Sequence, residues 1–225
     1  MSTQNEIIFR TDLSDGIAAL RRDLRGEDGP RISTIRNYNF ALLPYPPEEE
    51  FKLRARIHQL SAELVEEGWI VRSIALQTLL FQRLRALGED YIENVIATEH
   101  RLYTKAKALS RTVSPSAPEA AMTHLMGKLA QHIEGPQGLA ADVEREIDRI
   151  WRENPDKADR TVIFIGRAGA LYPFFRTSGL LKHLDGKTHN LPVVLLYPGE
   201  RRDTTALSFM GVLEPDRDYR PRIYP

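Results

Sequence analysis

Two short apolar runs near the C-terminal end carry the clearest pattern in the chain. Val162–Ile165 and Val193–Leu196 contain no charged or polar residue, which is typical of strands buried on both faces of a parallel sheet. A Leu-bearing helical segment separates them, as in a crossover connection. The turns that follow, Gly166–Gly169 and Pro198–Glu200, are polar and marked by glycine. Because ligands of open α/β sheets dock at the carboxyl ends of strands, these turns are the first candidates for a site.

The same alternation of strand and helix occurs earlier. Tyr38–Tyr45 reads as a strand, and Pro46-Pro47 opens a helix that is amphipathic through Leu53, Ile57, Leu60 and Leu64. Trp69–Ala75 reads as a second strand, and a leucine-rich helix follows it as far as Gly88. The pattern predicts an α/β fold with a mainly parallel sheet flanked by helices, similar to Rossmann and P-loop architectures.

The middle of the chain is expected to be helical. Residues 89–154 contain no strand pattern, and three amphipathic stretches are separated by Ser-Pro-Ser-Ala-Pro at 114–118 and by Gly135-Pro136. We therefore expect an N-terminal helical segment and link at 1–36, and a single α/β domain at 37–225 with a helical insertion at 89–154. The tail is expected to add a strand near Ala206–Val212 and an extended piece at Arg220–Tyr224.

Composition narrows the possible functions. The 31 Lys and Arg residues balance 31 Asp and Glu residues, so no overall charge draws the protein to nucleic acid or to anionic lipid. Because cysteine is absent, disulfides, thiolate nucleophiles and Cys-ligated metal sites are excluded. No stretch has the length of a membrane span, and the first residues lack a signal-peptide pattern. A cytoplasmic protein that binds no membrane is the expectation.

The expected strand ends lack the usual phosphate-binding groups. The turn after the first strand reads Leu-Pro-Tyr-Pro-Pro-Glu, where a phosphate cradle needs glycines with a Lys and a Ser or Thr. The Gly166–Gly169 turn lacks the third glycine and the distal acid of a dinucleotide fingerprint. Both segments favour plain turns, and no cofactor is expected.

Catalytic and metal motifs are equally weak. Ser178 and Ser208 lie outside any nucleophile motif, and a triad with the scattered histidines cannot be read from the sequence. The histidines show no H-E-x-x-H pattern. Glu50-Phe51-Lys52 has the E-x-K order of some nucleases, but Glu48–Glu50 is better explained as the first turn of a helix. No catalytic residue and no metal site are therefore expected.

Arginine and aromatic side chains gather near the expected strand ends and suggest a protein interface. Arg and Tyr anchor interfaces because they bury a large area while keeping hydrogen bonds. The candidate partner-binding residues are Arg167, Tyr172, Arg176, Glu200, Tyr219 and Arg220. The alternative is that the arginines form a solvated face and that Phe174 and Phe175 belong to the core.

Several of these segments resemble one known family. GRAGALYPFFR, LPVVLLYPGE, Leu207–Phe209 and Asp218–Arg220 are similar, in order and spacing, to the C-terminal signature of the BrxB family of BREX phage-defence systems. The resemblance covers roughly Thr161–Tyr224, with a looser fit over Tyr38–Leu87. The Arg201-Arg202-Asp203 segment departs from the family pattern, which more often has a Tyr-Asp-Gly-like turn there.

The resemblance implies a non-catalytic accessory subunit that works through contacts with other BREX components, in particular the alkaline-phosphatase-like protein PglZ. It implies contact with nucleic acid only through those components. Two alternatives stay open on the residues alone. One is a divergent magnesium-dependent nuclease or nucleotide hydrolase that uses Glu50 or Glu200. The other is a nucleic-acid-binding module built on the tail arginines.

Overall fold

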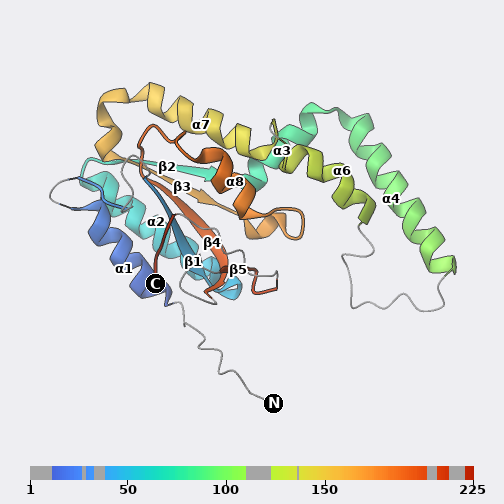
Figure 1. The fold of residues 1–225 in the computed structure, drawn as a ribbon, viewed down its shortest axis with the longest axis horizontal. Coiled ribbons are helices and arrows are strands. Elements are labelled where there is room, and N and C mark those ends of the chain that lie inside the picture. Colours follow the sequence, from blue (N-terminus) through green and yellow to red (C-terminus); the bar gives the residue numbers. More distant parts are fainter. Residues whose placement is uncertain are drawn as a thin grey trace, which may run out of the picture.

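A computed structural model describes residues 12–26, 29–32, 39–109, 123–135, 137–201, 207–212 and 221–225. Helices and strands alternate at both ends of the chain, and a run of helices separates β2 from β3, as the hydrophobic pattern predicts (Figure 1). The helices are α1 (Leu13–Leu24), α2 (Glu50–Glu66), α3 (Leu76–Ala86), α4 (Glu89–Leu109), α6 (Thr123–Ile133), α7 (Leu139–Glu153) and α8 (Thr177–Leu184). The strands are β1 (Phe40–Tyr45), β2 (Ile70–Ala75), β3 (Thr161–Gly166), β4 (Val193–Arg201), β5 (Leu207–Phe209) and β6 (Arg222–Ile223). Short 3₁₀ turns occur at Pro47–Glu49, Pro155–Arg160 and Gly169–Leu171.

The strands form one sheet in the order β2-β3-β4-β1-β6, with β5 attached to β4. Every pair on the main path is parallel, and only β4 and β5 are antiparallel. The predicted α/β class with a mainly parallel sheet is therefore confirmed. Because β1, β2, β3 and β4 run parallel, their carboxyl ends lie along the same edge of the sheet. This edge is called the carboxyl edge below.

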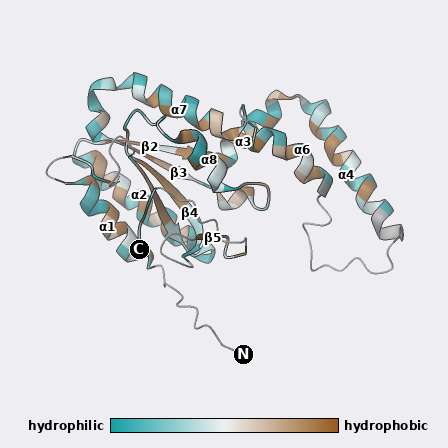
Figure 2. Ribbon diagram, viewed as in Figure 1, coloured by the Kyte–Doolittle hydropathy of each residue, from teal (hydrophilic) through white to brown (hydrophobic). Residues whose placement is uncertain are grey.

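The two faces of the sheet bury separate apolar cores. Alternate residues of each strand point to opposite faces, so Leu42, Ile163 and Leu195 pack under α3, α7 and α8. On the other face, Leu43, Phe164 and Val194 pack under α1 and α2. Figure 1 shows α7 and α8 on one side of the sheet and α1 and α2 on the other. Figure 2 shows the hydrophobic colour concentrated in the central strands, while the helices carry both colours.

Strand β4 is longer than its apolar run predicts, which corrects one expectation. The segment Pro198–Arg201 continues the strand and pairs with β5, instead of forming a terminal turn. Gly199 makes this pairing possible, because a Cβ there would lie 2.2 Å from the Ser208 carbonyl oxygen. The hydroxyl of Tyr197 also donates to the Leu207 carbonyl at 3.3 Å. The expected strand near 206–212 is thus β5, which covers only Leu207–Phe209.

The helical insertion divides into two parts. Helix α7 lies on the sheet through the buried side chains of Val143, Ile147 and Ile150. Helices α4 and α6 contact each other and extend away from the sheet as an arm (Figure 1). No strand occurs among the described residues of 89–154, as predicted, whereas the proline-rich 114–118 segment lies outside the described residues.

The two ends of the described chain meet on the α1 side of the sheet. The Tyr224 side chain is fully buried, and its hydroxyl donates to an oxygen of Asp23 at 3.0 Å. Arg222 pairs with the same carboxylate at 2.7 Å, and its guanidinium lies over the Tyr224 ring. Helix α1 buries Leu13, Ile17, Leu20 and Leu24 in the core that it shares with β1 and α2. The C-terminal segment therefore fixes α1 to the sheet.

Candidate functional site

Four polar side chains meet where β1, β2 and β3 end. Arg167 lies just after β3, and Gln77 lies in the first turn of α3. The Arg167 guanidinium donates to Gln77 Oε1 at 2.9 Å. The same guanidinium donates to Glu50 Oε1 at 3.3 Å, and the Tyr45 hydroxyl donates to the other oxygen of Glu50. This group, called the carboxyl-edge cluster, joins the first residue of α2 to the ends of two other strand–helix units.

Burial keeps the Tyr45 phenol of this cluster protonated. Removal of the ring from water raises the pKa of Tyr45 well above its usual range, and the hydrogen bond to the Glu50 carboxylate raises it further. The phenol therefore stays protonated and donates to Glu50. The Glu50 carboxylate thus has one partner on each oxygen, Tyr45 on one side and Arg167 on the other.

The backbone at Arg167 adopts an unusual conformation. Its φ is 63°, in the left-handed region where a side chain costs about 1–2 kcal/mol relative to the right-handed one. This conformation directs the guanidinium toward Gln77 and Glu50. Strained residues of this kind gather at functional sites because the surrounding contacts must hold them in place. His189, Asn190 and Met210 share the left-handed conformation, so the contacts of Arg167, and not its backbone alone, make the carboxyl edge the candidate site.

The cluster occupies the place where a nucleotide phosphate or a metal would be held in related architectures. The turn after β1 is the 3₁₀ segment Pro47–Glu49, which leads directly into α2. Its prolines lack N–H donors and its glutamates repel anions, so the turn does not fit a phosphate. Within the described ranges, no group of three or more His, Asp or Glu side chains is arranged to hold a metal ion.

The other candidate residues are spread around the same edge. Tyr172 is half-buried and packs against the core, and Arg176 is exposed at the start of α8 without an ion pair to the described residues. Glu200 lies opposite Ser208 in the β4–β5 pair and is half-buried. Tyr219 and Arg220 lie outside the described residues. The structure therefore places Arg167 in a cluster, and among the described residues its hydrogen bonds and ion pair go to Gln77 and Glu50 and not to the other candidates.

The aromatic pair next to Tyr172 contributes to packing. Phe175 is 3% exposed and meets Phe209 of β5 at a ring-centroid distance of 6.3 Å. Phe174 is half-buried and packs against the same core. Phe175 thus packs against β5. This agrees with the alternative in which Phe174 and Phe175 belong to the core.

An open groove of ≈ 990 Å³ runs from the cluster along α2. It lies between α2 and the face of β2 and β3. The end nearest the carboxyl edge is formed by Tyr45, Glu50 and Arg167. Two strongly exposed apolar side chains lie at its opposite ends, Phe51 (80% exposed) and Val65 (57% exposed). Exposed apolar surface that continues into a groove is typical of binding sites.

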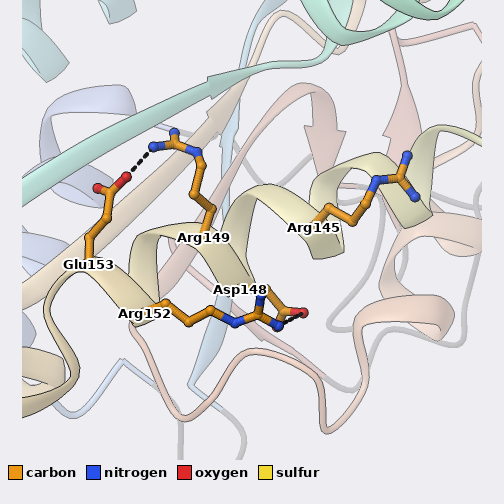
Figure 3. Close-up of a pocket in the computed structure, with 5 residues that line it drawn as sticks. All are labelled: Arg145, Asp148, Arg149, Arg152 and Glu153. Atoms are coloured by element: carbon orange, nitrogen blue, oxygen red, sulfur yellow. Dashed lines mark hydrogen bonds and ion pairs between the residues drawn. The ribbon is translucent and has the colours of Figure 1, made fainter.

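A second depression, of ≈ 530 Å³, has a different character. Figure 3 shows that all its lining side chains come from α7: Arg145, Asp148, Arg149, Arg152 and Glu153. Arg149 pairs with Glu146 and Glu153, and Arg152 pairs with Asp148, at the three- and four-residue spacings of neighbours on one helix face. These charges neutralise one another on a solvated surface, so the depression offers no distinct chemistry.

Sequence reasoning missed Tyr45, Gln77 and the groove itself. Gln77 is an ordinary residue in the first turn of a helix, and only the pairing of β2 with β3 brings it near Arg167. Tyr45 was recognised as the last residue of a strand and not as a partner of Glu50. The apolar residues Phe51 and Val65, outside the buried stripe of α2, were the one available signal for the groove.

A protein-family model described as BREX protein BrxB matches residues 72–223 of the chain. The match begins within β2, after α2, and includes β3, β4 and the insertion. No curated protein and no solved structure matches the chain. No helix in the described part of the chain is long and apolar enough to span a membrane.

Proposed function

Because this chain belongs to the BrxB family and is therefore a component of a BREX phage-defence system, we propose that it is a non-catalytic accessory subunit of that system. In this proposal it acts by binding other BREX subunits, with the alkaline-phosphatase-like protein PglZ as the direct partner. The single observation that carries the proposal is the family match over residues 72–223, which extends over β3, β4 and the insertion.

The carboxyl edge supports a binding role over a catalytic one. The residues that a hydrolase of this architecture would use there are engaged with each other, since Glu50 bonds to both Tyr45 and Arg167. A carboxylate in that state is a poorer ligand for magnesium, because one acceptor site on each oxygen is taken by a donor and the Arg167 guanidinium beside it repels a cation. The prolines after β1 likewise favour a turn that shapes a surface.

The exposed residues at the same edge have the composition of an interface. Arg176 is exposed at the start of α8, and Tyr172 and Phe174 beside it are half-buried. Partly exposed aromatic side chains next to an arginine are typical of residues that anchor protein contacts. We therefore assign the partner contact to the carboxyl edge, with Arg176, Arg167 and Tyr172 as contributing residues and Glu200 at its far side.

The test is co-expression of the chain with the PglZ-like subunit of the same locus, followed by affinity purification. Arg176→Glu is expected to lower the amount of PglZ-like protein recovered at least tenfold. Arg85→Glu, a reversal at another exposed arginine on α3, serves as the matched control and is expected to have no effect. Thermal unfolding of each variant verifies that the fold is intact.

Two outcomes would overturn the proposal. If the unmodified chain recovers no PglZ-like protein, the direct partner is wrong. If the purified chain cleaves DNA or a nucleoside triphosphate in the presence of Mg²⁺, and Glu50→Gln or Glu200→Gln abolishes that cleavage, the subunit is an enzyme.

A further inference from the structure

The groove beside α2 has the length of a site for a helix. Its lining includes both Phe51 and Val65 of α2, which are 14 residues apart and therefore about 21 Å apart along a helix. A helix of about four turns spans this distance.

The sheet under the groove lacks the cover that the other strands have. Ser73 of β2 is in register with Phe164 of β3, so it lies on the face that α1 and α2 cover. Phe164 is buried, but Ser73 is exposed and Val71 is only half-buried. The opposite face carries α3, α7 and α8. A strip of the α2 face over β2 is therefore left uncovered by the described residues.

The side of α2 that faces the strip is suited to contact with another helix. Arg54, His58, Ser61 and Val65 line the groove and follow one another at spacings of four, three and four residues, which places them on one side of the helix. Ala62 is also in the lining, and a small side chain there allows a second helix to approach closely. The lining of this side is mixed, because Phe51 and Val65 near its two ends are apolar and Arg54, one turn from Phe51, is cationic.

The charged residues that line the groove favour an acidic partner segment. Glu50 is its one acidic lining residue, and its carboxylate is already engaged by Tyr45 and Arg167. Arg54 is exposed and makes no ion pair with any residue in the described ranges. A partner that brings carboxylates to this end would gain a charge pair, and a partner that brings cations would be repelled.

We propose that the groove between α2 and β2 binds an amphipathic helix of the partner subunit, with apolar residues facing Val65 and Phe51 and carboxylates facing Arg54. This inference rests on the proposed function for the existence of the partner, and it adds the surface and the chemistry of the docking segment. It corresponds to the helix-in-groove mode of recognition, in which one helix places its apolar face in a preformed channel.

The test uses matched substitutions at exposed positions, in the co-purification with the PglZ-like subunit. Val65→Asp in the groove is compared with Ile96→Asp on the arm, because the two β-branched residues are similarly exposed, at 57% and 62%. Arg54→Glu in the groove is compared with Arg56→Glu, which is exposed on α2 but outside the groove lining. We expect Val65→Asp to lower recovery at least tenfold, Arg54→Glu several-fold, and the two controls to leave it unchanged.

A second measurement identifies the docking segment. Because the chain has no cysteine, Ala62→Cys creates a unique attachment point for a thiol-linked photo-crosslinker in the groove. Mass spectrometry of the crosslinked complex is expected to map the contact to a partner segment with helical apolar spacing and an excess of Asp and Glu.

The outcomes separate the inference from the proposed function. If the unmodified chain recovers no PglZ-like protein, the proposed function fails and the inference fails with it. If the unmodified chain binds and both groove variants bind equally well, the groove is not the docking site, although the proposed function stands. Loss of binding in Ile96→Asp alone would place the contact on the arm. A crosslink to a basic or extended partner segment would also overturn the inference.

Discussion

The contact between α3 and α7 allows a quantitative test of how the helical insertion is held to the sheet. Arg83 of α3 donates from two nitrogens to the two oxygens of Asp142 of α7, each at 2.7 Å, and also to the Gly138 carbonyl at 3.0 Å. Both side chains are shielded, with 19% exposure for Arg83 and 14% for Asp142. This is the forked geometry in which an arginine pairs most strongly with a carboxylate.

The perturbation is Arg83→Met, which keeps the length of the side chain and removes its charge. Breaking a fully buried pair costs about 3–5 kcal/mol, and an exposed pair contributes about 0–1 kcal/mol. Arg83 and Asp142 lie between these limits, and Asp142 keeps Arg145 as a second partner. We therefore expect the free energy of unfolding to fall by about 2 kcal/mol, which lowers Tm by roughly 4–8 °C in a chain of this size.

The assay is urea unfolding followed by far-UV circular dichroism, in a double-mutant cycle with Asp142→Asn. The coupling energy between the two positions is expected to be about 1.5 kcal/mol, since interacting residues in one network couple by about 0.5–3 kcal/mol. Arg149→Met, which removes an exposed arginine from the same helix (Figure 3), is the control and should leave unfolding unchanged. A coupling energy below about 0.5 kcal/mol would refute the reasoning.

Three further predictions follow from single features of the fold. Gly199→Ala would press a Cβ against the Ser208 carbonyl oxygen, so the β4–β5 pairing should open, as measured by faster amide hydrogen exchange at 207–209. Tyr224→Ala removes a fully buried ring and the partner of Asp23, and it should lower the free energy of unfolding by about 3–5 kcal/mol in urea titrations. Burial and the nearby charge of Arg83 lower the pKa of His132 below its ordinary value of 6.5, so the neutral form is favoured by folding. Stability should therefore be complete above pH 6.5 and decrease as the pH falls toward the folded-state pKa. His132→Gln should flatten that pH dependence, and an equally steep curve in the variant would contradict it.

The local elements could be predicted because each one is encoded by residues that are close in sequence. The helix Leu139–Glu153 begins just after the Gly135-Pro136 break that separates the predicted amphipathic stretches, and β3 includes the run Val162–Ile165 with one residue added at each end. Prolines at 46 and 47 start the helical segment before α2, as expected from their fixed φ and missing N–H. In these segments burial and local backbone preference favour the same conformation.

The candidate site was less predictable, because its contacts join positions far apart in the chain. Arg167 was expected near a partner face, and the structure adds that its guanidinium bonds to Gln77 and Glu50, which are 90 and 117 residues away. The turn expected at Pro198–Glu200 is strand, because β5 supplies a hydrogen-bonding partner that no local signal announces. The roles of Arg167, Tyr172, Arg176, Glu200, Tyr219 and Arg220 in binding stay predictions.

The sequence by itself determined which segments become helices and strands, that the sheet is mainly parallel, and that the chain resembles the BrxB family. These properties depend on hydrophobic periods and short motifs, which are read within about twenty residues. Only the tertiary structure decided the strand order, the carboxyl-edge cluster and the uncovered strip beside α2. Each of these depends on which strand lies beside which, and that is set by the packing of the whole core and not by any single segment.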